Sequence, residues 1–217
     1  MKKVQFGSYN SFDDFNLILS SIKIESPAPK TKTIDVEGGD SVLDLTELFG
    51  RISYKNRKIT MQFTVYNVSY SQLTALYTDI QNKIQGQKLD ISISDDSDFY
   101  YVGRLTISAY STTKNIGSIT IVADCEPYKY KKEITTKAQV VNGTATINLQ
   151  NMKKRVVPTI TTNASMSFAY EVGGTTYSGT HNAGVFKLPT LELTEGDNLV
   201  TITGTGNVTF AYQEGGL

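Results

Sequence analysis

The side chains that could support catalysis are few and far apart in this sequence. His181 is the only histidine among 217 residues, and it lies in a stretch rich in serine and glycine, residues 178–184, that we expect to be a surface loop. Ser178 is close to it, but the nucleophile-elbow motif that presents a catalytic serine is absent. Paired carboxylates for glycoside hydrolysis depend on spacing in three dimensions, and no pair stands out. The sequence nominates no catalytic residue and predicts a non-enzymatic protein.

Metal and cofactor sites are equally poorly supported. One histidine and one cysteine, Cys125, are too few for a zinc site. Asp95, Asp96 and Asp98 could attract Ca²⁺, but the glycine and the downstream glutamate of a calcium loop are missing, which favours a solvated hairpin turn. Residues 204–206, Gly-Thr-Gly, lack the third glycine and the following helix of a phosphate-binding loop. We therefore expect neither a metal nor a cofactor.

Aromatic residues in the last third of the chain raise the possibility of sugar binding, because aromatic rings can stack on sugar rings. The chain has no tryptophan, however, and two of the aromatics alternate along one predicted strand, so that both should pack inward. A carbohydrate-binding or adhesin module remains the alternative function. The aromatic residues concerned are Phe168, Tyr170, Tyr177, Phe186, Phe210 and Tyr212.

Charge and composition exclude several other classes of protein. The chain has 21 basic and 21 acidic residues, which argues against tight binding to nucleic acid, because such binding depends on surplus Lys and Arg that neutralise phosphates. No apolar run approaches the roughly 20 residues of a membrane span, and no apolar stretch of a secretion signal follows the basic start. A single cysteine rules out an intrachain disulfide. We expect Cys125 to be a half-buried thiol that is either structural or merely tolerated.

The first part of the chain reads as a β domain with one helix. Apolar and polar residues alternate over residues 59–65, 89–93, 101–109 and 119–123, as in strands with one buried face. Residues 70–85 instead repeat apolar residues at helical spacing. Ser69 with Gln72 resembles a capping box, and Gly86 stands where a C-terminal cap would. We expect the apolar side of this helix to pack on a sheet, and a docking surface for a partner is the alternative.

The sequence changes character near residues 129–136, a polar and charged stretch. From residue 131 it is rich in Thr, Gly, Asn and Val. Short strand-like runs are punctuated by glycines at 143, 173–174, 196 and 204–206, which we interpret as turns. This pattern is typical of a small β-sandwich or jelly roll. The sequence thus predicts a mainly β protein with two domains, residues 1–130 and 131–217.

Several blocks of the first domain resemble the distal tail proteins of phages with long, non-contractile tails. Together they follow the family's order through most of residues 1–130, and residues 157–160 and 207–215 are similar to the ends of its second domain. The blocks of the first domain are residues 17–22, 29–40, 43–46, 54–59, 100–105 and 123–130.

The resemblance implies a ring-forming, β-sandwich-like hub domain over residues 1–130 and a small galectin-like or carbohydrate-module-like β-sandwich over residues 131–217. The ring is hexameric in this family, lies at the virion tail tip and leaves a channel for DNA. The implied partners are further copies of the chain, the tail-tube protein and a tail-associated tip protein, with the tape measure and receptor-binding proteins as further candidates. Synthesis and assembly in the host cytoplasm are implied as well.

One proline-rich segment suits the contacts that a ring requires. Residues 26–30, Ser-Pro-Ala-Pro-Lys, favour polyproline or edge-strand geometry. Ring subunits need complementary surfaces that close on one another, and an extended segment can supply one of them. We interpret residues 26–30 either as a contact arm or as a plain loop between strands.

Overall fold

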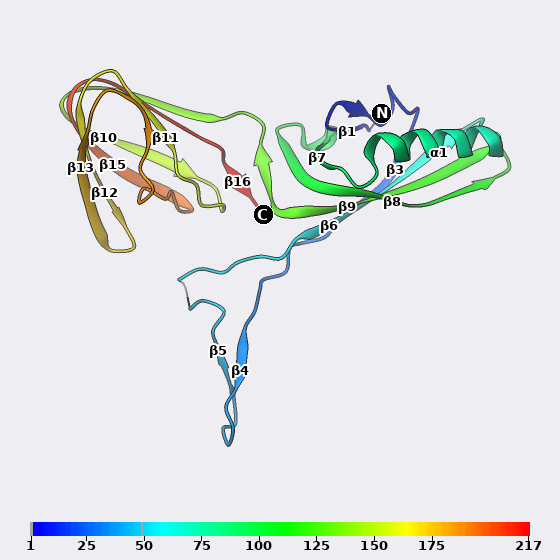
Figure 1. Ribbon diagram of the computed structural model, residues 1–217, viewed down its shortest axis with the longest axis horizontal. Coiled ribbons are helices and arrows are strands. Elements are labelled where there is room, and N and C mark those ends of the chain that lie inside the picture. The colour runs from blue at the N-terminus through cyan, green and yellow to red at the C-terminus, as the bar shows by residue number, and fades with distance from the viewer. Residues whose placement is uncertain (1, 49) are drawn as a thin grey trace. The chain divides into compact units, whose positions relative to one another are not determined.

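The computed structural model describes residues 2–48 and 50–217 (Figure 1). The chain divides into two compact units, Met1–Lys129 and Tyr130–Leu217. The sequence-based border lies one residue later, between residues 130 and 131. The fold is mainly β with one α-helix, which confirms the predicted fold class.

The first unit is built on a large sheet whose strands lie in the order β2-β1-β7-β8-β9-β6-β3. A short 3₁₀ helix, η1 (Ser94–Asp96), joins β7 to β8, so that the predicted hairpin there is confirmed. The strands are β1 (Val4–Phe6), β2 (Tyr9–Asn10), β3 (Ile18–Ile24), β6 (Arg57–Tyr66), β7 (Lys88–Ile93), β8 (Phe99–Thr113) and β9 (Ile116–Lys131).

Strict alternation of side chains builds the core of this unit. In β6, Ile59, Met61 and Phe63 are fully buried, while the residues between them face outward. The strand order places β7, β8 and β9 between β1 and β6. Nevertheless the ring of Phe6 in β1 lies edge-on to the ring of Phe63, with 6.2 Å between centroids. The sheet therefore curls around its own core, as a sandwich-like domain requires.

Helix α1 (Tyr70–Ile84) covers one face of this sheet, as predicted (Figure 1). Ser69 and Gln72 form the predicted capping box, in which each side chain bonds to the other residue's backbone. The buried side chains of the helix are Leu73, Ile80 and Ile84. Because they join the core cluster of the sheet, the helix contributes to the fold, and the alternative of a docking stripe is not supported.

Two short strands, β4 (Thr33–Asp35) and β5 (Val42–Asp44), form a separate two-stranded sheet between β3 and β6. All six residues of these strands are exposed. Figure 1 shows the β4–β5 hairpin extending away from the large sheet of the first unit. We call residues 26–48 and 50–55 the arm.

The second unit contains a six-stranded sheet in which β13-β12-β15-β11-β14 are neighbours and β10 pairs with β15. Its residues form a second, independent core cluster. The strands are β10 (Thr135–Asn151), β11 (Thr159–Thr162), β12 (Met166–Val172), β13 (Thr175–His181), β14 (Gly184–Lys187) and β15 (Gly196–Tyr212), and the short β16 (Gly215–Gly216) follows.

A single sheet supplies both layers of this unit because its two longest strands bend. β15 pairs with β10 along its whole length, with β12 through residues 200–204 and with β11 through residues 208–211. Gly143 of β10 lies opposite Gly204 of β15 where the pairing changes, and both have positive φ, 91° and 152°. Such backbone conformations favour glycine. Interpreting Gly143 and residues 204–206 as turns was wrong, since they lie inside strands.

Candidate assembly surfaces

The base of the arm is held by backbone hydrogen bonds between its two ends. The amide of Lys30 donates to the carbonyl of Ser53 at 2.7 Å, and the amide of Lys55 donates to the carbonyl of Ala28 at 2.8 Å. Pro29 lies opposite Tyr54 in an isolated bridge. The proline-rich segment is therefore one side of the arm's base, and it is followed by a hairpin rather than by a plain loop.

The outer part of the arm is also fixed locally. The amide of Thr46 donates to Oδ1 of Asp44 at 2.8 Å, directly after β5. Hydrogen bonds from Thr46 lower the pKa of Asp44, and the bond from its side chain has a larger effect than the bond from its backbone amide. The amide of Leu45 donates to the carbonyl of Lys32 at 2.8 Å, which continues the ladder between the two sides of the hairpin. The arm thus has defined backbone structure although it has no core of its own.

The arm exposes large apolar side chains. Monomeric proteins rarely expose many of these close together, and such patches commonly mark sites of protein–protein contact. Ile34 and Leu43 are directly opposite across the hairpin, so that their side chains share one face. The exposed fractions are 46% for Ile34, 51% for Val36, 52% for Val42, 52% for Leu43, 65% for Leu48 and 40% for Ile52.

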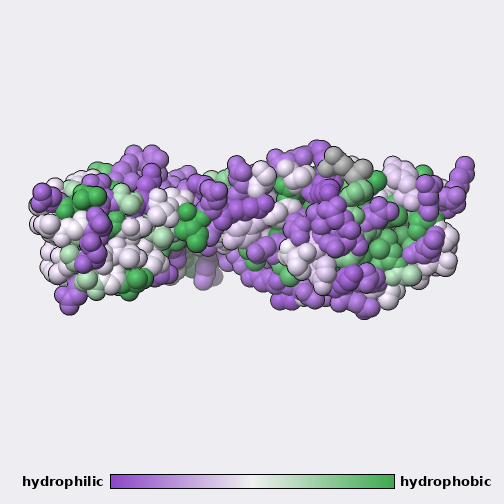
Figure 2. All heavy atoms as spheres, turned by 90° about the horizontal axis from the view of Figure 1, so that it is seen from above, coloured by the Kyte–Doolittle hydropathy of each residue, from purple (hydrophilic) through white to green (hydrophobic). Residues whose placement is uncertain are grey.

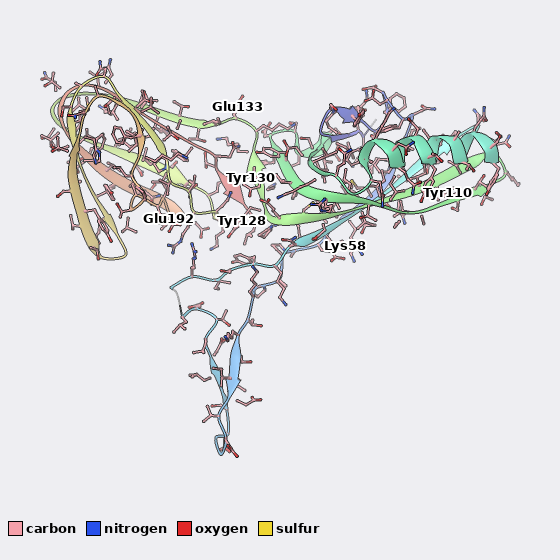
Figure 3. All side chains as sticks on the ribbon, viewed as in Figure 1. Lys58, Tyr110, Tyr128, Tyr130, Glu133 and Glu192 are labelled. Carbon is pink, nitrogen blue, oxygen red and sulfur yellow. The ribbon has the colours of Figure 1, made fainter. Side chains whose placement is uncertain are left out.

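A second exposed apolar cluster lies at the tip of the sheet of the first unit. Tyr66 at the end of β6 pairs with Ile116 at the start of β9, and Tyr70 is the first residue of α1. Their exposed fractions are 55%, 47% and 63%. Tyr110 packs beside Tyr77 of the helix with 4.4 Å between ring centroids, and Figure 3 shows it below α1. This cluster is a second candidate contact surface.

The outward face of β6 and β9 is polar and nearly free of charge at its centre. Gln62 lies opposite Thr120, and Thr64 lies opposite Ser118. Hydroxyl and amide groups extend this polar row onto β3, where Ser21 donates to Oε1 of Gln62 at 2.9 Å. A face of this kind offers hydrogen bonds without attracting phosphate groups strongly.

A buried arginine anchors the start of β6 to the end of β9. Arg57 is 5% exposed, and both its Nε, at 2.9 Å, and its Nη2 donate to the carbonyl of Pro127. Its guanidinium also lies 5.5 Å from the ring centroid of Tyr101. Because the arm leads directly into β6, this anchor fixes the point from which the arm departs.

Cys125 belongs to the same region, and its expected half-burial was wrong. The residue is completely buried, and burial raises the pKa of its thiol to about 12. Gly103 on the neighbouring strand leaves no room for a side chain, since an added Cβ would collide with Sγ of Cys125 and lie 3.1 Å from the carbonyl oxygen of Asp124. The thiol therefore fills a tight space in the core.

Two of the three aspartates between β7 and β8 are paired with lysines. Asp95 lies 2.5 Å from the ammonium of Lys2, and Asp96 lies 2.8 Å from that of Lys129. Two of the three carboxylates that could have attracted Ca²⁺ thus each face a separate cation, and Asp98 accepts a hydrogen bond from the hydroxyl of Ser97 at 3.2 Å. Among the residues that the structure describes, no group of three or more His, Cys, Asp and Glu side chains could hold a metal ion.

His181 is the last residue of β13 and not part of a surface loop, so that expectation was wrong. Its ring stacks on Phe186 with 4.8 Å between centroids and lies 6.2 Å from Phe168. Ser178 lies within the same strand. The loop interpretation failed because the glycine and serine residues before His181 are exposed strand residues.

Most of the candidate sugar-binding aromatic side chains are packed in the core of the second unit. Phe168, Phe210 and Tyr212 are buried, and the predicted inward packing of Phe210 and Tyr212 is confirmed. Tyr177 is 36% exposed, and its ring stacks on Tyr170 at 5.8 Å between centroids. The side chains therefore do not form an open aromatic platform of the kind that sugar stacking favours.

The helix among the described residues is too short and too polar to cross a membrane.

Comparison with known proteins is informative only at the level of three-dimensional structure. No family model matches the sequence, and no curated protein matches it. The crystal structure of the SPP1 Dit (gp 19.1) protein, described as a paradigm of the hub adsorption apparatus in phages that infect Gram-positive bacteria, superposes with a TM-score of 0.73. The two sequences are 13% identical, and the match covers 98% of this chain and 99% of that one. Over nearly its whole length the chain has the fold of a phage distal tail protein.

Proposed function

We propose that this chain is a structural, non-enzymatic hub protein of a phage or phage-like tail tip. It forms a hexameric ring that joins the tail tube to the tip and leaves a channel for DNA. The observation that carries the proposal is the full-length match to SPP1 Dit, which includes both units and leaves almost no part of either chain unmatched. A shared single domain would be weaker support, because one fold can host many functions.

The arm supports self-assembly. A closed ring requires that one surface of each subunit bind a different surface of the next. The arm offers a fixed backbone and exposed apolar side chains, including Ile34, Leu43 and Leu48. The neighbouring subunit in the ring is the partner that would cover them.

The polar face of β6 and β9 suits the lining of a DNA channel. DNA must slide through such a channel, and a surplus of lysine and arginine would retain it. Gln62, Thr64 and Thr120 provide polar groups without charge, and the chain as a whole has no net charge. In this arrangement the tail-tube protein and the tail-associated tip protein bind the two ends of the ring, with the tape measure and receptor-binding proteins as further candidate partners.

The mass of the assembly tests the proposal. Light scattering coupled to size-exclusion chromatography should give six times the 23.9 kDa of one chain, and negative-stain images should show rings with a central hole. A monomer at all concentrations, in the absence and presence of a purified tail tube, would contradict the proposal.

Charged substitutions in the arm test how the ring closes. Ile34→Asp together with Leu43→Asp should yield a folded monomer, because two carboxylates would enter an apolar contact. Both side chains are exposed in the single chain, so the unfolding midpoint should change little. Val140→Asp is the matched control, since Val140 is 72% exposed on the second unit and should leave the ring intact.

Division of the chain tests which unit makes the ring. Tyr130 is buried within the second unit, where the ammonium of Lys154 lies 4.2 Å from its ring centroid, so the division should precede this residue. Figure 3 labels Tyr130 with Tyr128 at the end of β9. We expect residues 1–129 to form rings and residues 130–217 to be a folded monomer. An oligomeric second unit beside a monomeric first would reverse these roles.

A further inference from the structure

The arm combines an exposed apolar face with a backbone that is already fixed. Ile34 and Leu43 lie opposite each other across the hairpin and are 46% and 52% exposed. Figure 2 looks on the face of the first unit that points away from the arm, and there hydrophobic residues are interspersed with hydrophilic ones. An ordered hairpin that holds large apolar side chains in water is typical of a surface that another protein covers.

The outer arm, residues 33–44, is acidic. It carries carboxylates and no lysine, arginine or histidine. Its register places Asp35 and Asp44 on the face opposite Ile34 and Leu43, as diagonal neighbours about 7–8 Å apart. Like charges at this separation repel each other, so a partner with cations would stabilise the hairpin. The acidic residues are Asp35, Glu37, Asp40 and Asp44.

The base of the arm has the opposite charge. Its two sides, residues 28–32 and 50–55, contain basic residues and no acidic one. The two backbone hydrogen bonds that join these sides place Lys30 and Lys55 on one face, again as diagonal neighbours. Both lysine side chains are exposed. The base therefore presents cations on an ordered backbone.

The far end of the outer arm cannot be neutralised by the base of the same arm. Asp35 lies five positions after Lys30, which is about 17 Å of extended chain. This separation is about twice the Debye length of ~8 Å at physiological salt. The hydrogen bond of 2.8 Å from the amide of Leu45 to the carbonyl of Lys32 holds the two sides of the hairpin together and keeps the arm extended. The base of another copy can approach these carboxylates where its own cannot.

We propose that the outer arm of one copy of this chain lies on the base of the arm of the next copy, with its carboxylates beside Lys30 and Lys55. One chain supplies both halves of this contact, so charge complementarity identifies a second copy as the occupant. The same contact would shield Ile34 and Leu43 from water. Because the two surfaces differ, the contact is heterologous and repeats from copy to copy, as a closed ring requires. This inference rests on the proposed ring and names the surface that receives the arm.

Charge reversal at each surface tests the contact on the full-length chain. Asp35→Lys with Glu37→Lys makes the outer arm basic, and Lys30→Glu with Lys55→Glu makes the base acidic. Either change places like charges against each other. Light scattering over a concentration series should show association only at concentrations raised by about tenfold or more, the loss expected for two exposed ion pairs. All four side chains are exposed, so urea unfolding should change little.

Combining the reversed surfaces separates complementarity from a general loss of assembly. The arm-reversed and base-reversed chains, mixed in equal amounts, should associate at concentrations where neither does so alone. In the mixture each basic arm meets an acidic base, and each acidic arm meets a basic base. A chain with all four changes should associate with itself for the same reason. Added salt should weaken association of the unmodified chain, because it screens exposed charges.

Lys137→Glu with Lys187→Glu is the matched control. Both lysines are exposed on the second unit, and the net charge changes by the same amount as in the base-reversed chain. This variant should associate as the unmodified chain does. If it dissociates the assembly as strongly as the base-reversed chain does, net charge and not the arm is responsible, and the proposal is overturned.

Two further results would overturn the proposal. They are unchanged association of the arm-reversed and base-reversed chains, and failure of both the mixture and the fourfold variant to associate. The hub role is judged separately, by the mass of the unmodified assembly. A hexamer that ignores every charge reversal would contradict the arm contact alone, and a dimer that matched charges restore would support the contact and contradict the ring. A chain that stays monomeric would overturn both.

Discussion

The two units of this protein bury their cores by different means. In the first unit a curled sheet is covered by α1, and alternating side chains such as Ile59 and Phe63 fill the space between. In the second unit one sheet bends back on itself at Gly143 and Gly204 and provides both layers. The fold of the first unit therefore depends mainly on large buried side chains. The fold of the second unit depends in addition on glycines at the bend.

The largest expected effect concerns side-chain packing in the first unit. Phe63→Ala should reduce the free energy of unfolding by about 3–5 kcal/mol, because it removes a fully buried ring that packs edge-on to Phe6. Tyr66→Ala in the same strand is the control. Tyr66 is 55% exposed, so its loss should cost no more than about 0.5 kcal/mol in urea unfolding. Similar losses for the two variants would contradict this account of the core.

The next effect concerns backbone geometry in the second unit. Gly204→Ala should cost about 1–3 kcal/mol, because φ is 152° and the new Cβ would lie 3.1 Å from Cγ of Met166 and 3.2 Å from the carbonyl oxygen of Ser165. Gly174, in the turn before β13, also has positive φ, but a Cβ added there would have no atom within 4 Å. Gly174→Ala is therefore the control. Hydrogen exchange of the second unit should therefore rise more for Gly204→Ala. An equal rise would mean that crowding at the bend has no role.

A pH-dependent effect distinguishes the cores further. The pKa of Cys125 is raised from 9.0 to about 12 by burial, so above pH 9 the thiol ionises in the unfolded chain before it does so in the folded one. The folded state then binds more protons, and stability falls as pH rises from 9 toward 12. Between pH 7 and pH 10 this group should cost about 1.4 kcal/mol.

Comparison with Cys125→Ala isolates this contribution, since the variant should lose less stability over the same pH range. Cys125→Ser should leave ring assembly intact while costing about 1–3 kcal/mol, because it buries a hydroxyl without a designed partner. A folded Cys125→Ser chain that cannot form rings would show that the thiol has a role beyond packing.

The smallest expected effect is that of His181→Ala. Loss of the stack on Phe186 should cost about 0.5–1.5 kcal/mol in the second unit and leave ring mass unchanged. Particles reconstituted with this variant should be as infectious as unmodified ones. A drop in infectivity with normal assembly would show that His181 has a function beyond packing against Phe186.

Local signals in the sequence were sufficient to predict several elements of this fold. Alternation in residues 59–65 and 119–123 specifies strands because side chains project to opposite faces, and Ser69 with Gln72 specifies the helix start because both bonds form within four residues. The ordered family-like blocks likewise led to the fold that the comparison with SPP1 Dit supports.

Features that depend on contacts between residues distant in sequence became visible only in the folded chain. Glycine at positions 143 and 204 looks the same in a turn and in a bent strand, and the pairing of β10 with β15 distinguishes the two. The complete burial of Cys125 depends on Gly103 of the neighbouring strand, and the position of His181 depends on pairing with β12. Exposure of the arm could not be predicted either, because apolar residues give the same local pattern whether or not the fold covers them.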